Sequence, residues 1–264
     1  MKNLILISLF IFGLQSQAAQ RNLIAVGQGI VSPSVTTNLI ISNGFTSENP
    51  TGIAYQNGFR ISGEFDTANN NNNMTNNDGM GAELGVGNGD MGLAFGYYKE
   101  DCTDCEGDVY GGFGILLGDF LGFGVSGQEE LYNAGVIFNP KGSMRFGVTA
   151  SLFNLDGDNN NITTFGAGVA YYGQAWSFSV DASKRAYEND TIKDDTIKIT
   201  PGLKMNIEKI HFSFNIDTYN NEPEGTNTDS NAWFGLGYGH GEPFNITLYH
   251  DYTKEWTFVL SMFF

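Results

Sequence analysis

Two cysteines are the residues of this sequence with the strongest potential for redox chemistry. Cys102 and Cys105 form a Cys-x-x-Cys motif, which acts in redox reactions when it opens the helix of a βαβ unit. No such unit is indicated around them, and the carboxylates of the surrounding segment KEDCTDCEGD disfavour the reactive thiolate. We therefore interpret Cys102 and Cys105 as a small disulfide in an outside loop of an exported protein.

The remaining candidates for chemistry do not combine into a catalytic or metal site. The only histidines are His211, His240 and His250, and no Gly-x-Ser-x-Gly nucleophile motif accompanies them. Asp217 lies on the same strand face as His211, but six residues apart is too far for a pair. The segment DGDNNN at 156–161 lacks a glycine at the sixth position and the distal glutamate of a calcium loop. We predict no catalytic residues, no metal, no cofactor and no enzyme activity.

The elements that position these residues are β-strands. From residue 54 onward, apolar side chains recur at every second position, which is the period of a strand. Phe59, Ile61 and Phe65 show this pattern early in the chain, and Phe258 and Leu260 show it near the end. The pattern predicts about 14 strands, with 12 as the alternative. Each is close to the ~9–11 residues that a tilted strand needs to cross a bilayer.

The connections between these strands alternate in length. Short turns such as GNGD and NPKGS alternate with long acidic or asparagine-rich segments such as TANNNNNMTNNDG and NNEPEGTNTDSN. Up-and-down barrels of outer membranes have short periplasmic turns and longer outside loops, whereas a β-sandwich gives no reason for this asymmetry. Because lipid cannot satisfy an open sheet edge, the strands must close. We predict an all-β fold, a closed antiparallel up-and-down transmembrane β-barrel over residues 54–264.

Two segments precede the barrel. Residues 1–18 carry Lys2, an apolar stretch too short to span a bilayer and a small-x-small cleavage site, which together predict a secretory signal peptide; a retained anchor is the alternative. Residues 19–53 carry only two charged residues, Arg21 and Glu48, and are not of low complexity. We expect them to form a separate N-terminal segment that could plug the lumen. The net charge of −16 argues against nucleic acid as a partner.

The inner face of the predicted barrel carries two kinds of residue. The polar lumen-facing candidates are Arg60, Glu64, Asp181, Lys198, Lys204, His211, Asn215, Asp217, Asn245 and Tyr249. Small residues form a second part of the wall, namely Gly81, Gly85, Gly92, Gly96, Gly112, Gly114, Gly122 and Gly124. Inward glycines indicate either sheet curvature or the close approach of another segment, for which residues 19–53 are the candidate.

The ion selectivity of such a lumen stays open at this stage. Arg60, Lys198 and Lys204 could form a modest basic patch if the first strand closes near the last ones, whereas the overall acidity favours cations.

The end of the chain resembles that of Gram-negative outer-membrane β-barrel proteins, including porins. Apolar residues occupy alternate positions up to a terminal phenylalanine, namely Trp256, Phe258, Leu260, Met262 and Phe264. In that family this pattern is the signal recognised by the barrel-assembly machinery. The resemblance implies export through the inner membrane, location in the outer membrane, and membrane lipid and the assembly machinery as partners.

A shorter resemblance concerns the residues before the first strand. The segment ENPTGIAY at 48–55 is similar to the NPAG-type segment of FadL-like transporters of hydrophobic compounds. That resemblance implies 14 strands and an N-terminal hatch inside the barrel.

Three functions are compatible with these features. The first is a passive porin-like channel for small solutes. The second is a plugged FadL-like barrel that moves hydrophobic compounds or lipid. The third is an abundant structural protein that organises lipid and self-associates as a homo-oligomer through small outward residues such as Ala82, Ala134 and Ala150.

Replacing Phe264 with aspartate is expected to abolish assembly, because the charge removes the terminal apolar residue of the proposed assembly signal. The measurement is the amount of protein in the outer-membrane fraction and its resistance to SDS without heating. A variant that still folds into the membrane at normal levels would overturn the assignment.

Overall fold

The computed structural model describes ten stretches of the chain. They are residues 49–67, 79–100, 107–128, 131–153, 161–173, 175–187, 196–220, 230–239, 243–250 and 256–264. The predicted signal peptide, residues 19–48, His240, the proposed Cys102–Cys105 disulfide and nearly all of the 156–161 loop lie outside the described residues.

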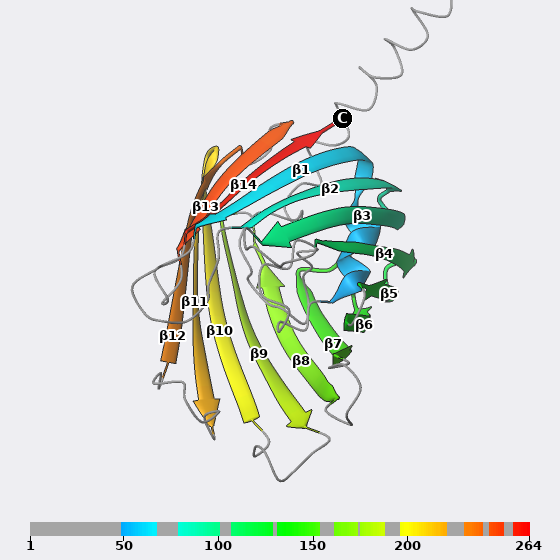
Figure 1. Cartoon of the computed structure of the whole chain (residues 1–264), viewed down its shortest axis with the longest axis vertical. Coiled ribbons are helices and arrows are strands. Elements are labelled where there is room, and N and C mark those ends of the chain that lie inside the picture. The colour runs from blue at the N-terminus through cyan, green and yellow to red at the C-terminus, as the bar shows by residue number, and fades with distance from the viewer. Residues whose placement is uncertain are drawn as a thin grey trace, which may run out of the picture.

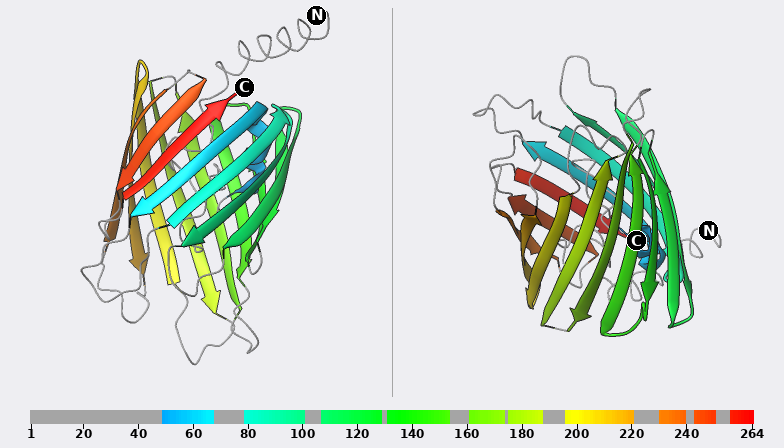
Figure 2. Two further views of the ribbon diagram at one scale, coloured as in Figure 1. Left: turned by 45° about the horizontal axis from the view of Figure 1, so that its top comes forward. Right: turned by 90° about the horizontal axis from the view of Figure 1, so that it is seen from below.

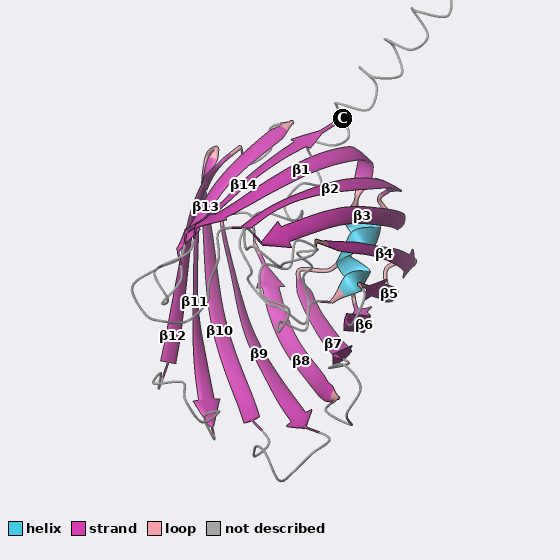
Figure 3. Ribbon diagram, in the orientation of Figure 1, coloured by secondary structure: helices cyan, strands magenta, loops and turns pink. Residues whose placement is uncertain are grey.

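The described residues form 14 strands in a closed antiparallel barrel, in which each strand pairs with its sequence neighbours and β1 pairs with β14 (Figure 1, Figure 3). The strands are β1 (Asn57–Thr67), β2 (Gly79–Asn88), β3 (Met91–Glu100), β4 (Asp108–Leu117), β5 (Leu121–Gly127), β6 (Leu131–Phe138), β7 (Met144–Phe153), β8 (Ile162–Tyr172), β9 (Trp176–Tyr187), β10 (Thr196–Ile207), β11 (Ile210–Asn220), β12 (Ser230–Tyr238), β13 (Phe244–His250) and β14 (Trp256–Phe263). The predicted fold class and strand count are therefore confirmed.

The outer face of the barrel is apolar. On β2, Met80 and Leu84 are 60% and 51% exposed, whereas Glu83 between them is 1% exposed. The same alternation places large apolar side chains on the outside of the other strands, which tilt around the interior in both views of Figure 2. A continuous apolar belt of this kind is stable only against lipid. We therefore treat the strands as membrane-spanning.

The barrel closes where the last strand meets the first. The Phe59 N–H donates to the Phe264 carbonyl oxygen at 3.0 Å, and the Phe264 N–H donates to the Phe59 carbonyl oxygen at 2.8 Å. The rings of Phe59 and Phe264 also approach, with centroids 6.3 Å apart. Gly58 precedes this pair with a φ of +80°, and a Cβ added to it would contact the Phe264 carbonyl oxygen. The terminal residue is thus part of the seam.

The chain enters the barrel through a short 3-10 helix, η2 (Pro50–Tyr55), which lies against β3–β6 (Figure 3). Asn49 caps it, because its side-chain oxygen accepts from the Thr51 N–H at 3.0 Å, and Pro50 fits the first helical position. Ala54 and Tyr55, which the period of two assigned to the barrel, therefore belong to the helix, and β1 begins at Asn57. No helix among the described residues is long and apolar enough to cross a membrane.

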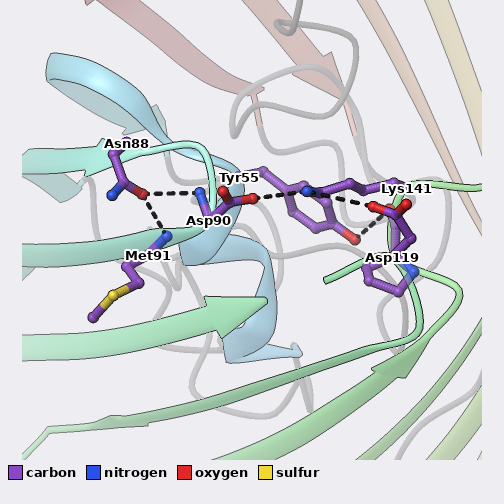
Figure 4. Close-up of polar contacts among 7 residues, drawn as sticks. Tyr55, Asn88, Asp90, Met91, Asp119 and Lys141 are labelled. Atoms are coloured by element: carbon purple, nitrogen blue, oxygen red, sulfur yellow. Dashed lines mark hydrogen bonds and ion pairs between the residues drawn. The ribbon is translucent and has the colours of Figure 1, made fainter. Parts of the chain in front are cut away.

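One lysine joins three connections on the rim of the barrel at which Phe264 lies. We call this the short-turn rim, and the loop-length pattern assigns it to the periplasm. Lys141, between β6 and β7, places its Nζ 2.9 Å from Asp90 Oδ1 and 3.5 Å from Asp119 Oδ1 (Figure 4). Asp90 lies between β2 and β3, and Asp119 lies between β4 and β5. The hydrogen bond to Asp90 is the main reason that the pKa of Lys141 is raised. One side chain thereby links three turns, although such exposed ion pairs add little stability.

Gly58→Ala is expected to destabilise the seam more than Gly118→Ala does. The φ angles of these glycines are +80° and +65°, so alanine costs each position roughly 1–2 kcal/mol of backbone energy. Only Gly58 also faces the Phe264 carbonyl oxygen, whereas nothing lies within 4 Å of a Cβ at Gly118. The measurement is the urea midpoint of unfolding from lipid vesicles. Equal shifts for the two variants would contradict this account of the seam.

Candidate functional site

One side of the barrel interior, from β9 through β14 to β1, is lined by polar side chains. Among the predicted lumen residues on it, seven are buried and on the inner face, namely Arg60, Glu64, Asp181, Lys204, His211, Asn215 and Asn245. Lys198 and Tyr249 are half-buried. Asp217 pairs with Asn231 in the β11–β12 ladder, and its side chain lies outside the described part of the structure. Whether these residues line a solute pathway stays a prediction.

On this side, a buried network of hydrogen-bonded side chains connects β11 to β13 across β12. His211 Nε2 lies 3.1 Å from Thr247 Oγ1, and that hydroxyl donates to Asn245 Oδ1 at 2.9 Å. Because the Thr247 hydrogen is directed to Asn245, His211 Nε2 is the donor to Thr247. Gly237 lies between the two strands, and a Cβ on it would contact the His211 ring. The glycine therefore allows side chains from β11 and β13 to meet.

Arg60 on β1 forms a buried ion pair with Glu83 on β2. Gly85 lies opposite Arg60 in the register, and a Cβ there would be only 3.2 Å from Arg60 Nη2. Gly85 thus leaves room for the guanidinium. Sequence reasoning missed Glu83, although its position between Gly81 and Gly85 in the period of two indicated an inward side chain.

The structure does not place Arg60 beside the two predicted basic residues of β10. Four strands, β11 to β14, separate β1 from β10. Lys204 instead pairs with Ser177 and Ser213 in the register, and Lys198 pairs with Ser183 and Tyr219. The continuous basic patch of Arg60, Lys198 and Lys204 is therefore not formed on neighbouring strands.

The opposite side of the interior, β3–β6, is built from glycines covered by η2. A Cβ on Gly114 would lie 2.6 Å from the Ala54 nitrogen, and one on Gly122 would lie 2.6 Å from Thr51 Cγ2. Among the eight predicted wall glycines, those that face η2 are Gly92, Gly112, Gly114, Gly122 and Gly124. The other three face side chains of the barrel wall: Gly81 faces Tyr98, Gly85 faces Arg60 and Gly96 faces Tyr110. The close approach of another segment therefore accounts for five of these eight glycines.

The start of η2 is hydrogen-bonded to the barrel backbone. Asn49 Nδ2 donates to the Val136 carbonyl oxygen at 3.1 Å, and Thr51 Oγ1 donates to the Gly135 carbonyl oxygen at 3.0 Å. Asn49 and Thr51 are both fully buried. The chain is therefore already inside the barrel at Asn49. Of the predicted plug, residues 19–53, only residues 49–53 are described, and residues 19–48 lie outside the described part of the chain.

The end of η2 contacts an arginine that sequence reasoning did not select. Arg145, on β7, places its Cζ 5.1 Å from the Tyr55 ring centroid and 4.3 Å from the Tyr172 ring centroid. Cation–π contacts of this kind contribute roughly 0.5–2 kcal/mol each. The Tyr55 hydroxyl donates to the Pro140 carbonyl oxygen at 2.9 Å, and burial raises the pKa of Tyr55 to about 12. The available signal was the position of Arg145 between the outward-facing Met144 and Phe146.

The five residues of the predicted assembly signal lie along the last strand and directly after it. Trp256, Phe258, Met262 and Phe264 are exposed on the outer face, and Leu260 is half-buried. Recognition of these residues by the assembly machinery stays a prediction. Within the described stretches, no group of three or more histidine, cysteine, aspartate or glutamate side chains could hold a metal ion.

Gly114→Val is expected to displace η2, because the new side chain would overlap the Ala54 backbone. Displacement would break the bonds of Asn49 and Thr51 to the Val136 and Gly135 carbonyl oxygens. Without these anchors the helix should open more often, which frees its Gly52 and Gln56 amides. Hydrogen exchange followed by mass spectrometry should show faster exchange in residues 49–56. Gly63→Val is the control, because the nearest atom to a Cβ there is 3.9 Å away. Unchanged exchange in Gly114→Val would contradict the packing of η2 on this wall.

No protein-family model matches the sequence, and no curated protein matches it. Solved structures do share its fold. The toluene transporter TbuX of Ralstonia pickettii superposes with a TM-score of 0.58 at 10% identity, over 82% of this chain and 92% of that chain. The toluene transporter TodX of Pseudomonas putida superposes with a TM-score of 0.55 at 9% identity, over 90% of this chain and 97% of that chain.

The outer-membrane protein Omp33 of Acinetobacter baumannii is also similar, with a TM-score of 0.50 at 9% identity, over 80% of this chain and 100% of that chain. The chain therefore has the fold of outer-membrane β-barrels. This fold and the apolar outer belt agree with the outer-membrane location expected from the sequence.

Proposed function

We propose that the protein is a passive outer-membrane channel for small solutes, in which the N-terminal segment narrows the lumen. The observation that carries this proposal is the polar side of the interior, from β9 through β14 to β1. Serine, threonine and asparagine side chains alternate there with a few charges of both signs. Polar interiors of membrane barrels are typical of water-filled passages.

The charges of this lining support passage of polar solutes without strong selection by charge. Arg60 is neutralised by Glu83, Lys198 and Lys204 add two positive charges, and Glu64 and Asp181 add two negative charges. A strongly selective pore would present a ring or ladder of one sign. The lining therefore favours a general passage over a selective one.

A second candidate function, movement of hydrophobic compounds, is supported by the other side of the interior. Ile53 of η2 packs with Ala94 and Tyr110 in a buried apolar cluster, and Tyr98 lies against it. TbuX and TodX, which share the fold, are described as toluene transporters. A hydrophobic compound would travel along this apolar cluster rather than along the polar side.

Planar-bilayer conductance of the full chain and of a variant lacking residues 19–48 tests these functions. A porin-like channel should give steady ohmic steps, and the deletion should raise the conductance because it removes the segment before Asn49. The matched assay is vesicle uptake of arabinose and of toluene by both proteins. Silence of both proteins, with SDS-resistant oligomers, would overturn the channel and favour the structural role. Toluene uptake without arabinose uptake would favour the second candidate.

A further inference from the structure

Arg145 differs from the other buried arginine of the interior. Arg60 has the Glu83 carboxylate as its partner, whereas no carboxylate among the described residues pairs with Arg145. Arg145 is 5% exposed, and its Nη1 has no hydrogen-bond partner in the described part of the chain. Burying a charge without a counterion is costly, so an arrangement of this kind is expected where an acceptor arrives from outside.

The contacts of Arg145 involve its Nε and its cation, but not its Nη1. Its Nε donates to the Gly142 carbonyl oxygen at 3.1 Å, and its cation lies over the rings of Tyr55 and Tyr172. Ring contacts use the face of a guanidinium, while carboxylates and phosphates bind to its edge. The Tyr172 hydroxyl is a second buried donor without a partner among the described residues. Two unpartnered donors thus belong to the same cluster.

We propose that Arg145 and Tyr172 form an anion-binding site in the lumen at the short-turn rim, which takes the carboxylate or phosphate group of a small solute. Arg145 is the second residue of β7 after the β6–β7 turn, so the site lies at the mouth that the loop pattern assigns to the periplasm. Tyr55 belongs to η2, while Arg145 and Tyr172 belong to the barrel wall. Displacement of Tyr55 would therefore give a solute access to Arg145 while the strands of the barrel stay paired.

The proposal rests on the proposed channel function only for the route by which the anion arrives. Binding itself can be measured without conductance. Isothermal titration calorimetry of the folded full chain in detergent, with acetate and inorganic phosphate as probes, measures the dissociation constant of each oxyanion. The tighter probe identifies the group that the site prefers.

Arg145→Gln should weaken binding of the preferred oxyanion about ten- to a hundredfold, because a charge-assisted bidentate contact is lost. Arg145→Lys keeps the charge but not the planar guanidinium, so its affinity should lie between those of the wild type and Arg145→Gln. Lys141→Gln is the matched control, since it removes the same charge from the same rim and should leave the affinity unchanged. Folding of every variant is checked by its resistance to SDS without heating.

Tyr172→Phe keeps the ring against Arg145 and removes only the hydroxyl, so it tests the site even if Arg145→Gln fails to fold. We expect it to weaken binding about two- to tenfold. Oxyanion binding that is absent from the wild type, or unchanged in Arg145→Gln or Tyr172→Phe, would overturn the site. Binding that depends on Arg145 in a protein without conductance would support the site and contradict the channel, so the two proposals fail separately.

Discussion

Closure of β1 on β14 is the constraint on which the rest of the structure depends. In lipid, no backbone N–H or carbonyl can turn to water, so the first and last strands must pair. The paired hydrogen bonds between Phe59 and Phe264 complete this closure at one rim, and Gly58 leaves room for the terminal carbonyl. Phe264 therefore has a structural role in closing the barrel.

Once the barrel is closed, its interior divides into two unlike sides. Polar side chains project from β9 through β14 to β1, and glycines on β3–β6 leave the space that η2 occupies. The helix can lie close to the sheet because five of the inward positions beneath it are glycines. Its side chains also complete hydrogen bonds with strand carbonyl groups. The N-terminal helix is thus an integral part of one wall.

The β6–β7 turn joins these features at the short-turn rim. Pro140 accepts a hydrogen bond from Tyr55, Lys141 contacts Asp90 and Asp119, and Gly142 accepts one from Arg145. Three consecutive residues of one turn therefore connect the helix, two neighbouring turns and the buried arginine. Figure 4 shows the Tyr55 and Lys141 contacts side by side.

Strands, closure and membrane location could be predicted from the sequence, because apolar alternation and loop length are local properties that a barrel repeats 14 times. The inward glycines were also recognised in the sequence, but they suit sheet curvature as well as close approach of residues 19–53, and only the structure distinguished the two. The start of β1 was assigned too early, because Tyr55 happens to continue the period of two, while Asn49 and Pro50 favour a helix. Glu83 and Arg145 occupy positions that alternate with outward-facing residues, yet a single residue between outward neighbours carries little signal.

Only the tertiary structure decided which buried charges are paired. Arg60 pairs with Glu83 on the neighbouring strand, whereas Arg145 contacts tyrosines from η2 and β8. Such partners depend on register and on the position of the helix, which no local pattern specifies.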